Sequence, residues 1–306
     1  MKSCTVSRDD VRRVFSPLPE RMNKGGMGRL LVVCGSYDPC GASMSGAAYF
    51  AACAAYRCGA GIVEMFTPRE NYAALAALIP EAVFSLYGND ESPDSIASRL
   101  TYSLAKSDAI VLGCGLGKSE RSRLLVKTVL ESVACPLLID ADGLNILSED
   151  ESLWSLLSAE QRKRTVITPH PGEMSRLCGA SVSDILSDVS ETARSFAAKK
   201  GIVCLLKDHH TVITDGNFVY INQSGNAGMA TAGMGDVLAG IIGALLARVE
   251  KTEFCKGESD VLIQSAVGAY LHGRAGDLAA EKIGQYSLIA SDLLAEIPSA
   301  IVGFFG

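Results

Sequence analysis

The sequence predicts an α/β fold with a doubly wound, mostly parallel sheet and helices on both of its faces. Short apolar runs alternate with helical segments along most of the chain, which is the pattern of successive β–α–β units. Several of these runs are apolar without a break, as in strands that are buried on both faces. Glycine-rich or acidic segments follow the runs, where the ligand loops of such sheets lie.

The composition is that of an ordinary globular protein. The chain has 306 residues, of which 48% are hydrophobic and 20% are charged, and its net charge is −6. We expect one domain over residues 1–306, with residues 1–22 forming an N-terminal arm. The mild acidic balance argues against binding to nucleic acid or to membrane surfaces.

Neither the start of the chain nor its cysteines suggest export. No apolar run reaches 18 residues, and the residues after Met1 lack the apolar core of a signal peptide. The ten cysteines form no C-x-x-C pair, which argues against zinc and redox motifs. We therefore expect free thiols in a reducing cytoplasm.

The first part of the chain predicts an ordered series of elements. A short helix within residues 5–28 precedes the turn N-K-G-G-M-G and a buried strand at 29–34. An alanine-rich helix at 45–58 has small residues that favour close packing on a sheet. The series then continues with a strand at 62–66, a helix at 69–78, a strand at 82–87, a helix at 94–106 and a strand at 109–112.

Polar and glycine-rich segments follow the next strands. The loop L-G-C-G-L-G at 112–117 lacks the final glycine of a dinucleotide fingerprint. The strand at 137–142 ends in two acids, which are costly to bury unless they are paired, solvated or used. Asp142 fits equally well as the N-cap of a helix at 144–147. His170 lies between two prolines that fix where its imidazole points, and Glu173 favours the start of a helix through residue 178.

The segment K-D-H-H-T at 207–211 reads as a polar hinge after a strand at 202–206. A single amphipathic helix is expected before it, at 182–200. Lys207 fits a phosphate or ribose contact and fits a solvated charge equally well. The adjacent histidines suggest a metal only weakly, because neighbours in an extended segment point to opposite sides. A hairpin turn at 215–217 and helices at 260–280 and 290–305, which close the second face of the sheet, complete the chain.

Residues 225–240 read G-N-A-G-M-A-T-A-G-M-G-D-V-L-A-G, and the predicted chemistry depends on them. The apolar residues after Asp236 have helical spacing, so the glycines form a loop before a helix N-terminus, where free amides and the helix dipole bind anions. Asp236 is either a first-turn acid that complements the dipole or a base that takes a proton from an attacking hydroxyl. The long run of small residues favours the base, because a structural cap does not need it.

The sequence also resembles a known family. G-x-G-D after a small-residue loop resembles the anion-hole and base motif of the ribokinase-like superfamily, and G-M-A-T-A-G-M-G-D-V-L-A-G resembles the NAD(P)H-hydrate dehydratases, which repair hydrated nicotinamide cofactors. The likeness extends from Lys24 to about Pro298. Further blocks that carry it are K-G-G-M-G-R-L-L-V-V-C-G-S, G-C-G-L-G, L-L-I-D-A-D-G-L-N, T-P-H-P-G-E-M and K-D-H-H-T-V-I-T-D-G.

The resemblance implies two sets of binding residues. The hydrated cofactor would contact Ala47, Gly115, Gly117, His170 and Asp236. The residues implied for the adenine nucleotide are Lys207, Asp208, His209, His210, Thr211 and Gly235, and the amides of Gly233, Met234 and Gly235 would form the anion hole.

The sequence departs from the family pattern in three places. Asn23 stands where the family often has histidine, and Cys114 stands where proline is usual. The residues at 208–210 replace a segment in which small residues are commoner. This last departure leaves the contacts within the nucleotide segment open.

The resemblance also implies a reaction. ADP or ATP would phosphorylate the C6 hydroxyl of the hydrates NADHX and NADPHX, with Asp236 as the base, and loss of phosphate would restore NADH or NADPH. Mg²⁺ would bridge the nucleotide phosphates, so no metal site made of protein ligands is expected. Two alternatives use the same motif: a ribokinase-like small-molecule kinase and a non-catalytic nucleotide sensor.

The family likeness adds expectations about partners. Relatives are often homotetramers, so we expect a homo-oligomer. Many relatives carry an epimerase domain at the N-terminus, and since this chain has no room for one we expect the epimerase to be a separate chain.

Overall fold

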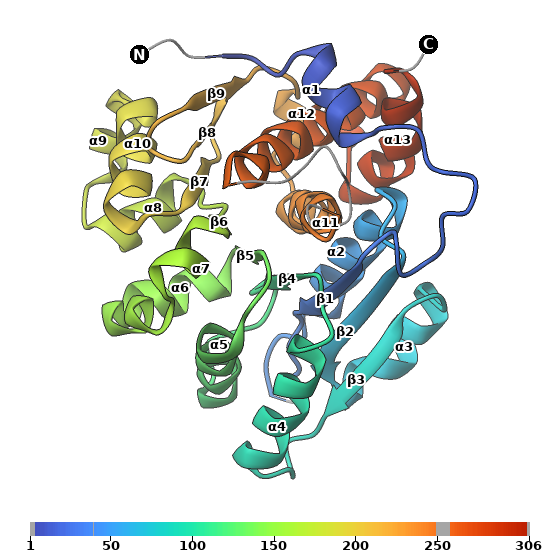
Figure 1. The fold of residues 1–306 in the computed structure, drawn as a ribbon, viewed down its shortest axis with the longest axis vertical. Coiled ribbons are helices and arrows are strands. Elements are labelled where there is room, and N and C mark those ends of the chain that lie inside the picture. The colour runs from blue at the N-terminus through green and yellow to red at the C-terminus, as the bar shows by residue number, and fades with distance from the viewer. Residues whose placement is uncertain (1–3, 39, 249–257, 305–306) are drawn as a thin grey trace.

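The computed structural model describes residues 4–38, 40–248 and 258–304, and within them strands and helices alternate as the sequence predicts (Figure 1). The described strands form a sheet with the order β3-β2-β1-β4-β5-β6-β7-β8-β9. Their bounds are Arg29–Val33 (β1), Ile62–Pro68 (β2), Val83–Tyr87 (β3), Ala109–Leu112 (β4), Leu137–Ile139 (β5), Thr165–Ile167 (β6), Val203–Leu206 (β7), Thr211–Thr214 (β8) and Val219–Asn222 (β9).

The sheet is mostly parallel, which confirms the predicted class. The strands from β3 to β7 all pair in parallel, whereas β8 pairs antiparallel with both β7 and β9. The chain runs outward from β1 to β3, then returns to place β4 on the other side of β1. In doubly wound sheets, ligands bind at the carboxyl ends of the strands near such a reversal.

Helices cover both faces of the sheet, and consecutive residues of one strand enter two different cores. Leu30 and Val32 pack with one set of helices, and Leu31 and Val33 pack with the other. The first set is α1 (Arg8–Val14), α2 (Ser45–Arg57), α3 (Tyr72–Leu78), α11 (Met234–Leu246), α12 (Glu258–Ile283) and α13 (Ala290–Val302). The second set is α4 (Pro93–Leu104), α5 (Glu120–Ser132), α6 (Asp142–Glu149), α8 (Pro171–Cys178), α9 (Val182–Ser187) and α10 (Val189–Lys200).

The predicted helix at 182–200 is wrong in one respect, because the structure divides it into α9 and α10. Asp188 lies between them with φ −151° and ψ 81°, and its side chain accepts a hydrogen bond from the Glu191 amide. Such a local side-chain bond competes with helix continuation and starts a new helix instead.

Other elements also differ from prediction. Asp142 is the first residue of α6, and its carboxylate does not cap that helix; the N-cap position belongs to Ala141. The helices α5 and α7 (Ala159–Lys163) lie in stretches for which no element was predicted. The last predicted helix ends at Val302, and Phe305 lies outside the described residues. None of the helices in the described ranges has both the length and the apolar character of a membrane span.

Candidate functional site

A cleft of about 720 Å³ lies beyond the carboxyl ends of β6 and β7. Its walls come from the segment after β7, the loop before α11, the start of α11 and the middle of α12. The lining includes Lys207, Asp208, His209, Thr211, Asn226, Thr231, Met234, Gly235, Leu238 and His272. A cleft of this size suits a ligand of nucleotide dimensions.

The start of α11 presents the amides of the predicted anion hole. Gly233 is the N-cap with φ 90°, and a Cβ there would lie 2.8 Å from the Cβ of Ala290 and 2.9 Å from the Phe50 ring. Only glycine fits that backbone and that space. Asp236 follows in the first turn, among amides that have no acceptor within the helix. The interpretation that the loop leads into a helix start is confirmed.

The pKa of the Asp236 carboxyl is raised toward neutral pH. Burial and the nearby charge of Asp140 raise its pKa from 3.8 to about 6, against the smaller opposing effects of Cys114 and Lys207. A pKa near the working pH is what general acid–base catalysis requires. A first-turn acid that only complemented the helix dipole would not need such an environment.

Lys207 is a half-buried ion-pair partner, so the alternative of a solvated charge is wrong. Its Nζ lies 2.9 Å from Asp140 Oδ1 and 3.9 Å from Glu173 Oε2. Both carboxylates are almost fully buried, with 3% and 7% of their side chains exposed. Burial lowers the pKa of Lys207, but the two carboxylates outweigh that effect and the net direction is upward. Lys207 is therefore a fixed positive charge in the cleft wall.

Gly235 lies directly beside this ion pair. A Cβ at Gly235 would be 3.6 Å from Lys207 Nζ and 3.7 Å from Asp140 Oδ2. The structure thus gathers the end of β5, the end of β7 and the start of α11 at one point. Asp140 was not among the predicted site residues, although two acids after a buried strand are a signal that marks it.

Three of the residues predicted for the cofactor side lie in the loop after β4 and at the start of α2. A Cβ at Gly115 would lie 2.7 Å from the Cβ of Ala47, so the loop after β4 runs against the start of α2. Gly117 donates its amide to Asp142 Oδ2 at 2.8 Å. Both glycines have positive φ, 60° and 71°, which other residues rarely adopt. Neither Ala47 nor these two glycines lines the cleft described above.

His170 lines the cleft and also caps a helix. Its Nδ1 accepts a hydrogen bond from the Gly172 amide at 3.0 Å, and Glu173 in return accepts the His170 amide at 2.8 Å. Burial and the charge of Lys207 lower the pKa of His170, which favours the neutral ring. Because Nδ1 is the acceptor, the neutral ring carries its proton on Nε2, which lies 3.5 Å from Glu173 Oε1.

The expectation that His209 and His210 point to opposite sides is wrong. Their rings stack, with centroids 4.3 Å apart and planes inclined by 27°. The chain bends at 208–210 and is not extended, so the alternation of a strand does not apply. His209 lines the cleft together with Asp208, whereas His210 is not among the lining residues.

Sequence reasoning missed the residues that hold the loop before α11. Asp277 of α12 accepts hydrogen bonds from the Gly225 amide at 3.1 Å and from Asn226 Nδ2 at 3.0 Å. His272 lines the cleft, with its Nε2 3.0 Å from the Met234 carbonyl oxygen. Nothing in the local sequence of α12 distinguishes these polar residues from its solvent-facing ones.

Two of the departures from the family pattern fit their surroundings. Asn23 Oδ1 accepts the Gly26 amide at 3.0 Å and so stabilises the turn before β1. Cys114 is fully buried, and its Sγ lies 3.9 Å from Asp140 Oδ2. In the ranges that the structure describes, no three His, Cys, Asp or Glu side chains converge as a metal site.

Comparison with known proteins gives a consistent set of relatives. Residues 30–299 match the family model described as NAD(P)H-hydrate dehydratase. The chain is 40% identical over 294 residues to a bifunctional NAD(P)H-hydrate repair enzyme of Moorella thermoacetica, covering 92% of this chain and 51% of that protein. It is 38% identical over 285 residues to the ADP-dependent (S)-NAD(P)H-hydrate dehydratase of Neisseria meningitidis, covering 92% and 86%. The chain thus spans about half the length of the bifunctional relative.

Solved structures show the same fold. An ADP/ATP-dependent NAD(P)H-hydrate dehydratase of Bacillus subtilis, co-crystallised with ATP and Mg²⁺, superposes with a TM-score of 0.78 at 26% identity, over 99% of each chain. A ribokinase-like superfamily protein of Enterococcus faecalis superposes with a TM-score of 0.82 at 27% identity, over 98% of this chain and 95% of that one. The ribokinase-like fold expected from the sequence is confirmed.

Proposed function

Since the chain belongs to the NAD(P)H-hydrate dehydratase family, we propose that it dehydrates NADHX and NADPHX to NADH and NADPH, with ADP or ATP as the phosphoryl donor. The observation that carries this proposal is the Asp236 carboxyl. Its pKa is raised to about 6, and it follows Gly235 at the start of α11, beside the Lys207–Asp140 ion pair.

In the first step, the substrate's C6 hydroxyl attacks the terminal phosphoryl group of the nucleotide. Asp236 accepts the hydroxyl proton as the new O–P bond forms. The amides of Gly233, Met234 and Gly235 stabilise the charge on the transferring phosphoryl oxygens, because the first-turn amides of a helix have no other acceptor. Lys207 holds positive charge beside the phosphates.

In the second step, the C6–O bond breaks and phosphate leaves with the bonding electrons. The lone pair of the ring nitrogen supplies the electrons that replace them, and loss of a proton from C5 restores the dihydropyridine. Hydroxide is a poor leaving group and phosphate is a good one, so phosphorylation makes this elimination possible.

Mg²⁺ neutralises phosphate charge when it enters with the nucleotide. The described residues offer no cluster of three ligand side chains, and Mg²⁺ commonly binds through phosphates, water and one or two carboxylates. Asp140 and Asp236, beside Gly235 at the start of α11, would offer carboxylate oxygens of the kind that this ion prefers.

The proposal is tested by incubating the protein with NADHX, Mg²⁺ and either ADP or ATP. Recovery of the dihydropyridine absorbance supports repair. The nucleotide that gives the faster recovery is the preferred phosphoryl donor. Consumption of the nucleotide without recovery would identify a kinase that stops at the phosphorylated alcohol. Binding without consumption would identify a nucleotide sensor. Either of the last two results would refute the proposal.

The cellular setting of this activity is proposed on the same family basis. We propose a homo-oligomer in the cytoplasm that works with an NAD(P)HX epimerase, an activity that relatives such as the bifunctional repair enzymes suggest by their names. Size-exclusion chromatography with light scattering measures the oligomeric state, and a monomer would refute that part.

The Gly235→Val variant is expected to raise the KM for ADP or ATP by about tenfold or more, equivalent to about 1.4 kcal/mol or more. The position has a helical backbone, and a Cβ there would make only ordinary contacts with Lys207 and Asp140, so the fold should survive. The additional methyl groups of valine would occupy the space through which phosphate approaches the amides. Gly235→Ala is the matched control and should have a smaller effect. Unchanged nucleotide affinity in the valine variant would show that the loop is only a turn.

The role of His170 can be separated from its capping role by two substitutions. His170→Ala should lower the free energy of unfolding by about 0.5–2 kcal/mol, because α8 loses its N-cap. His170→Asn should restore that stability, because asparagine is a good N-cap. Both variants should raise the KM for NADHX by roughly two- to tenfold, the effect of losing one hydrogen bond, with little change in kcat. A wild-type KM in His170→Asn would show that His170 acts only as a cap.

A further inference from the structure

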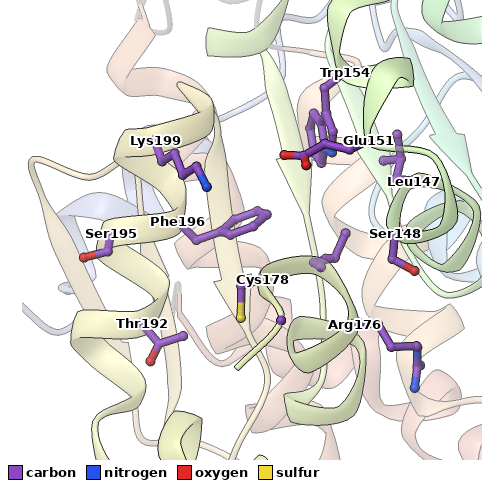
Figure 2. Close-up of a pocket in the computed structure, with 12 residues that line it drawn as sticks. Leu147, Ser148, Glu151, Trp154, Arg176, Cys178, Thr192, Ser195, Phe196 and Lys199 are labelled. Carbon is purple, nitrogen blue, oxygen red and sulfur yellow. The ribbon is translucent and has the colours of Figure 1, made fainter. Parts of the chain in front are cut away.

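A second cavity, of about 480 Å³, lies at the C-terminal end of α8, whereas the cleft lies at its N-terminal end, and the reaction above makes no use of this cavity. It lies between the end of α6, the turn that follows it, α8 and α10 (Figure 2). Its volume falls within the range of small-molecule sites. The cleft and this cavity share no lining residue.

One part of the cavity wall is aromatic. Trp154 and Phe196 meet edge to face, with ring centroids 6.4 Å apart, and both are almost fully buried. Figure 2 shows Phe196 extending from α10 toward Trp154. Leu147 and Leu177 add aliphatic surface. This wall suits a flat apolar group, because aromatic rings stack or pack edge to face.

The charge around the cavity is positive. Lys199 and Arg176 both line it, and the acidic member of the lining, Glu151, is bonded to Lys200 at 2.7 Å. Lys199 extends from α10 toward the same end of the cavity as Glu151 and Trp154 (Figure 2). With Glu151 neutralised by Lys200, the two remaining cations favour an anionic ligand.

A chain of hydrogen bonds leads from this cavity to the loop predicted to bind the cofactor. Arg176 Nε donates to Asn145 Oδ1 at 3.0 Å, and Asn145 Nδ2 donates to Asp142 Oδ1 at 3.2 Å. The other oxygen of Asp142 accepts the Gly117 amide at 2.8 Å. A ligand that draws Arg176 away from Asn145 would release the side chains that position this loop.

We propose that this cavity is a regulatory site for a small aromatic anion, and that an anion bound there weakens binding of the hydrated cofactor through Arg176, Asn145 and Asp142. The binding step is independent of the proposed function, whereas the regulatory step rests on it. An occupied site changes the substrate affinity to the extent that the ligand favours the arrangement with Arg176 displaced.

Trp154 is the single tryptophan of the chain, so its fluorescence reports the occupancy of this cavity. The probe is phenylphosphonate, with methylphosphonate as the anion without a ring and benzyl alcohol as the ring without a charge. The titrations contain saturating Mg²⁺–ADP, which fills the anion site of the cleft. Phenylphosphonate should change the emission saturably, with a half-saturating concentration at least about tenfold below those of the two controls.

Two lysine variants locate the probe. Lys199→Ala should raise the half-saturating concentration by about fivefold, the effect of losing one charge-assisted contact. Lys127→Ala, an exposed lysine of α5 that does not line the cavity, should leave it unchanged. A titration without saturation, or one with equal concentrations in Lys199→Ala and wild type, would overturn the site.

The regulatory step is measured as the KM for NADHX at saturating phenylphosphonate. It should rise at least about threefold in wild type and much less in Lys199→Ala, with methylphosphonate as the control. An emission change without a change in KM would overturn regulation. A protein that does not dehydrate NADHX at all would refute the proposed function, and the fluorescence titration would still decide whether the site exists.

Discussion

Asp236→Asn is expected to lower kcat by roughly 10²–10⁴, the usual contribution of a general base. Asparagine keeps the size and the polarity of the side chain but cannot accept the hydroxyl proton. The KM values for NADHX and for the nucleotide should change little, because the amides at the start of α11 and the Lys207–Asp140 pair remain. Near wild-type kcat would refute the assignment of Asp236 as the base.

The pH dependence of the wild type should report the same group. Burial beside Asp140 raises the pKa of Asp236 to about 6, so kcat should fall below about pH 6 as the base becomes protonated. The Asp236→Asn variant should lose that dependence. A wild-type rate that stays flat from pH 8 to pH 5 would mean that another group takes the proton.

Stability should change in the opposite direction to activity. A carboxyl whose pKa is raised in the folded state stabilises the fold below its unfolded pKa of 3.8, and this contribution is lost as the pH rises through about 6. At pH 8 the ionised Asp236 is therefore destabilising, and Asp236→Asn should raise the free energy of unfolding by about 1–3 kcal/mol. Denaturant unfolding at pH 8 and at pH 5 measures the effect, which should shrink at the lower pH.

Asp260→Asn is the matched control for both measurements. Asp260 is also buried, with 5% of its surface exposed, and burial raises its pKa. It lies near the start of α12, nine residues before Ala269, the first α12 residue in the cleft wall, and away from Asp140 and Lys207, so its replacement should leave kcat unchanged. A similar loss of kcat in this variant would mean that the effect of Asp236→Asn is not specific to the base.

The strands and most of the helices could be predicted because each depends on a local pattern. The continuous apolar runs at β1, β4 and β7 indicate strands that are buried on both sides, and the structure confirms them. The loop before α11 could also be predicted from a local pattern, because the apolar residues that follow it have helical spacing. The division between α9 and α10 could not be predicted. The amphipathic pattern continues through both helices, and only the hydrogen bond to the Asp188 side chain separates them.

The site itself was only partly predictable, because its decisive contacts join distant segments. Lys207 and Asp140 are 67 positions apart, and only the sheet brings the ends of β5 and β7 together. The local sequence of Lys207 therefore could not distinguish a solvated charge from one that is paired with carboxylates. Asp277, which accepts hydrogen bonds from the loop before α11, follows that loop by about 50 residues, and its local sequence does not indicate this role. The roles of the site residues toward ligands stay predictions.

Lys207→Met is expected to lower the free energy of unfolding by about 3–5 kcal/mol, because it leaves two buried carboxylates without compensating charge. Here the loss leaves Asp140 and Glu173, both nearly buried, without their cation. Nucleotide affinity should also fall, since a positive charge beside the phosphates disappears. Lys200→Met is the matched control: its stem is also buried, but its partner Glu151 is 77% exposed, so the cost should be no more than about 1 kcal/mol.

Two further measurements separate charge from packing as the cause of that loss. Adding Asp140→Asn to Lys207→Met removes one of the two carboxylates that have lost their cation, and should restore part of the stability. Lowering the pH should have the same effect, because burial already raises the pKa of Glu173, and loss of Lys207 raises it further. The stability that this group contributes is present while it is protonated and is lost as the pH rises through its folded pKa. The difference between Lys207→Met and wild type should therefore shrink from pH 8 to pH 5. If it stays constant, Lys207 stabilises the fold through the packing of its stem, and its charge is not needed there.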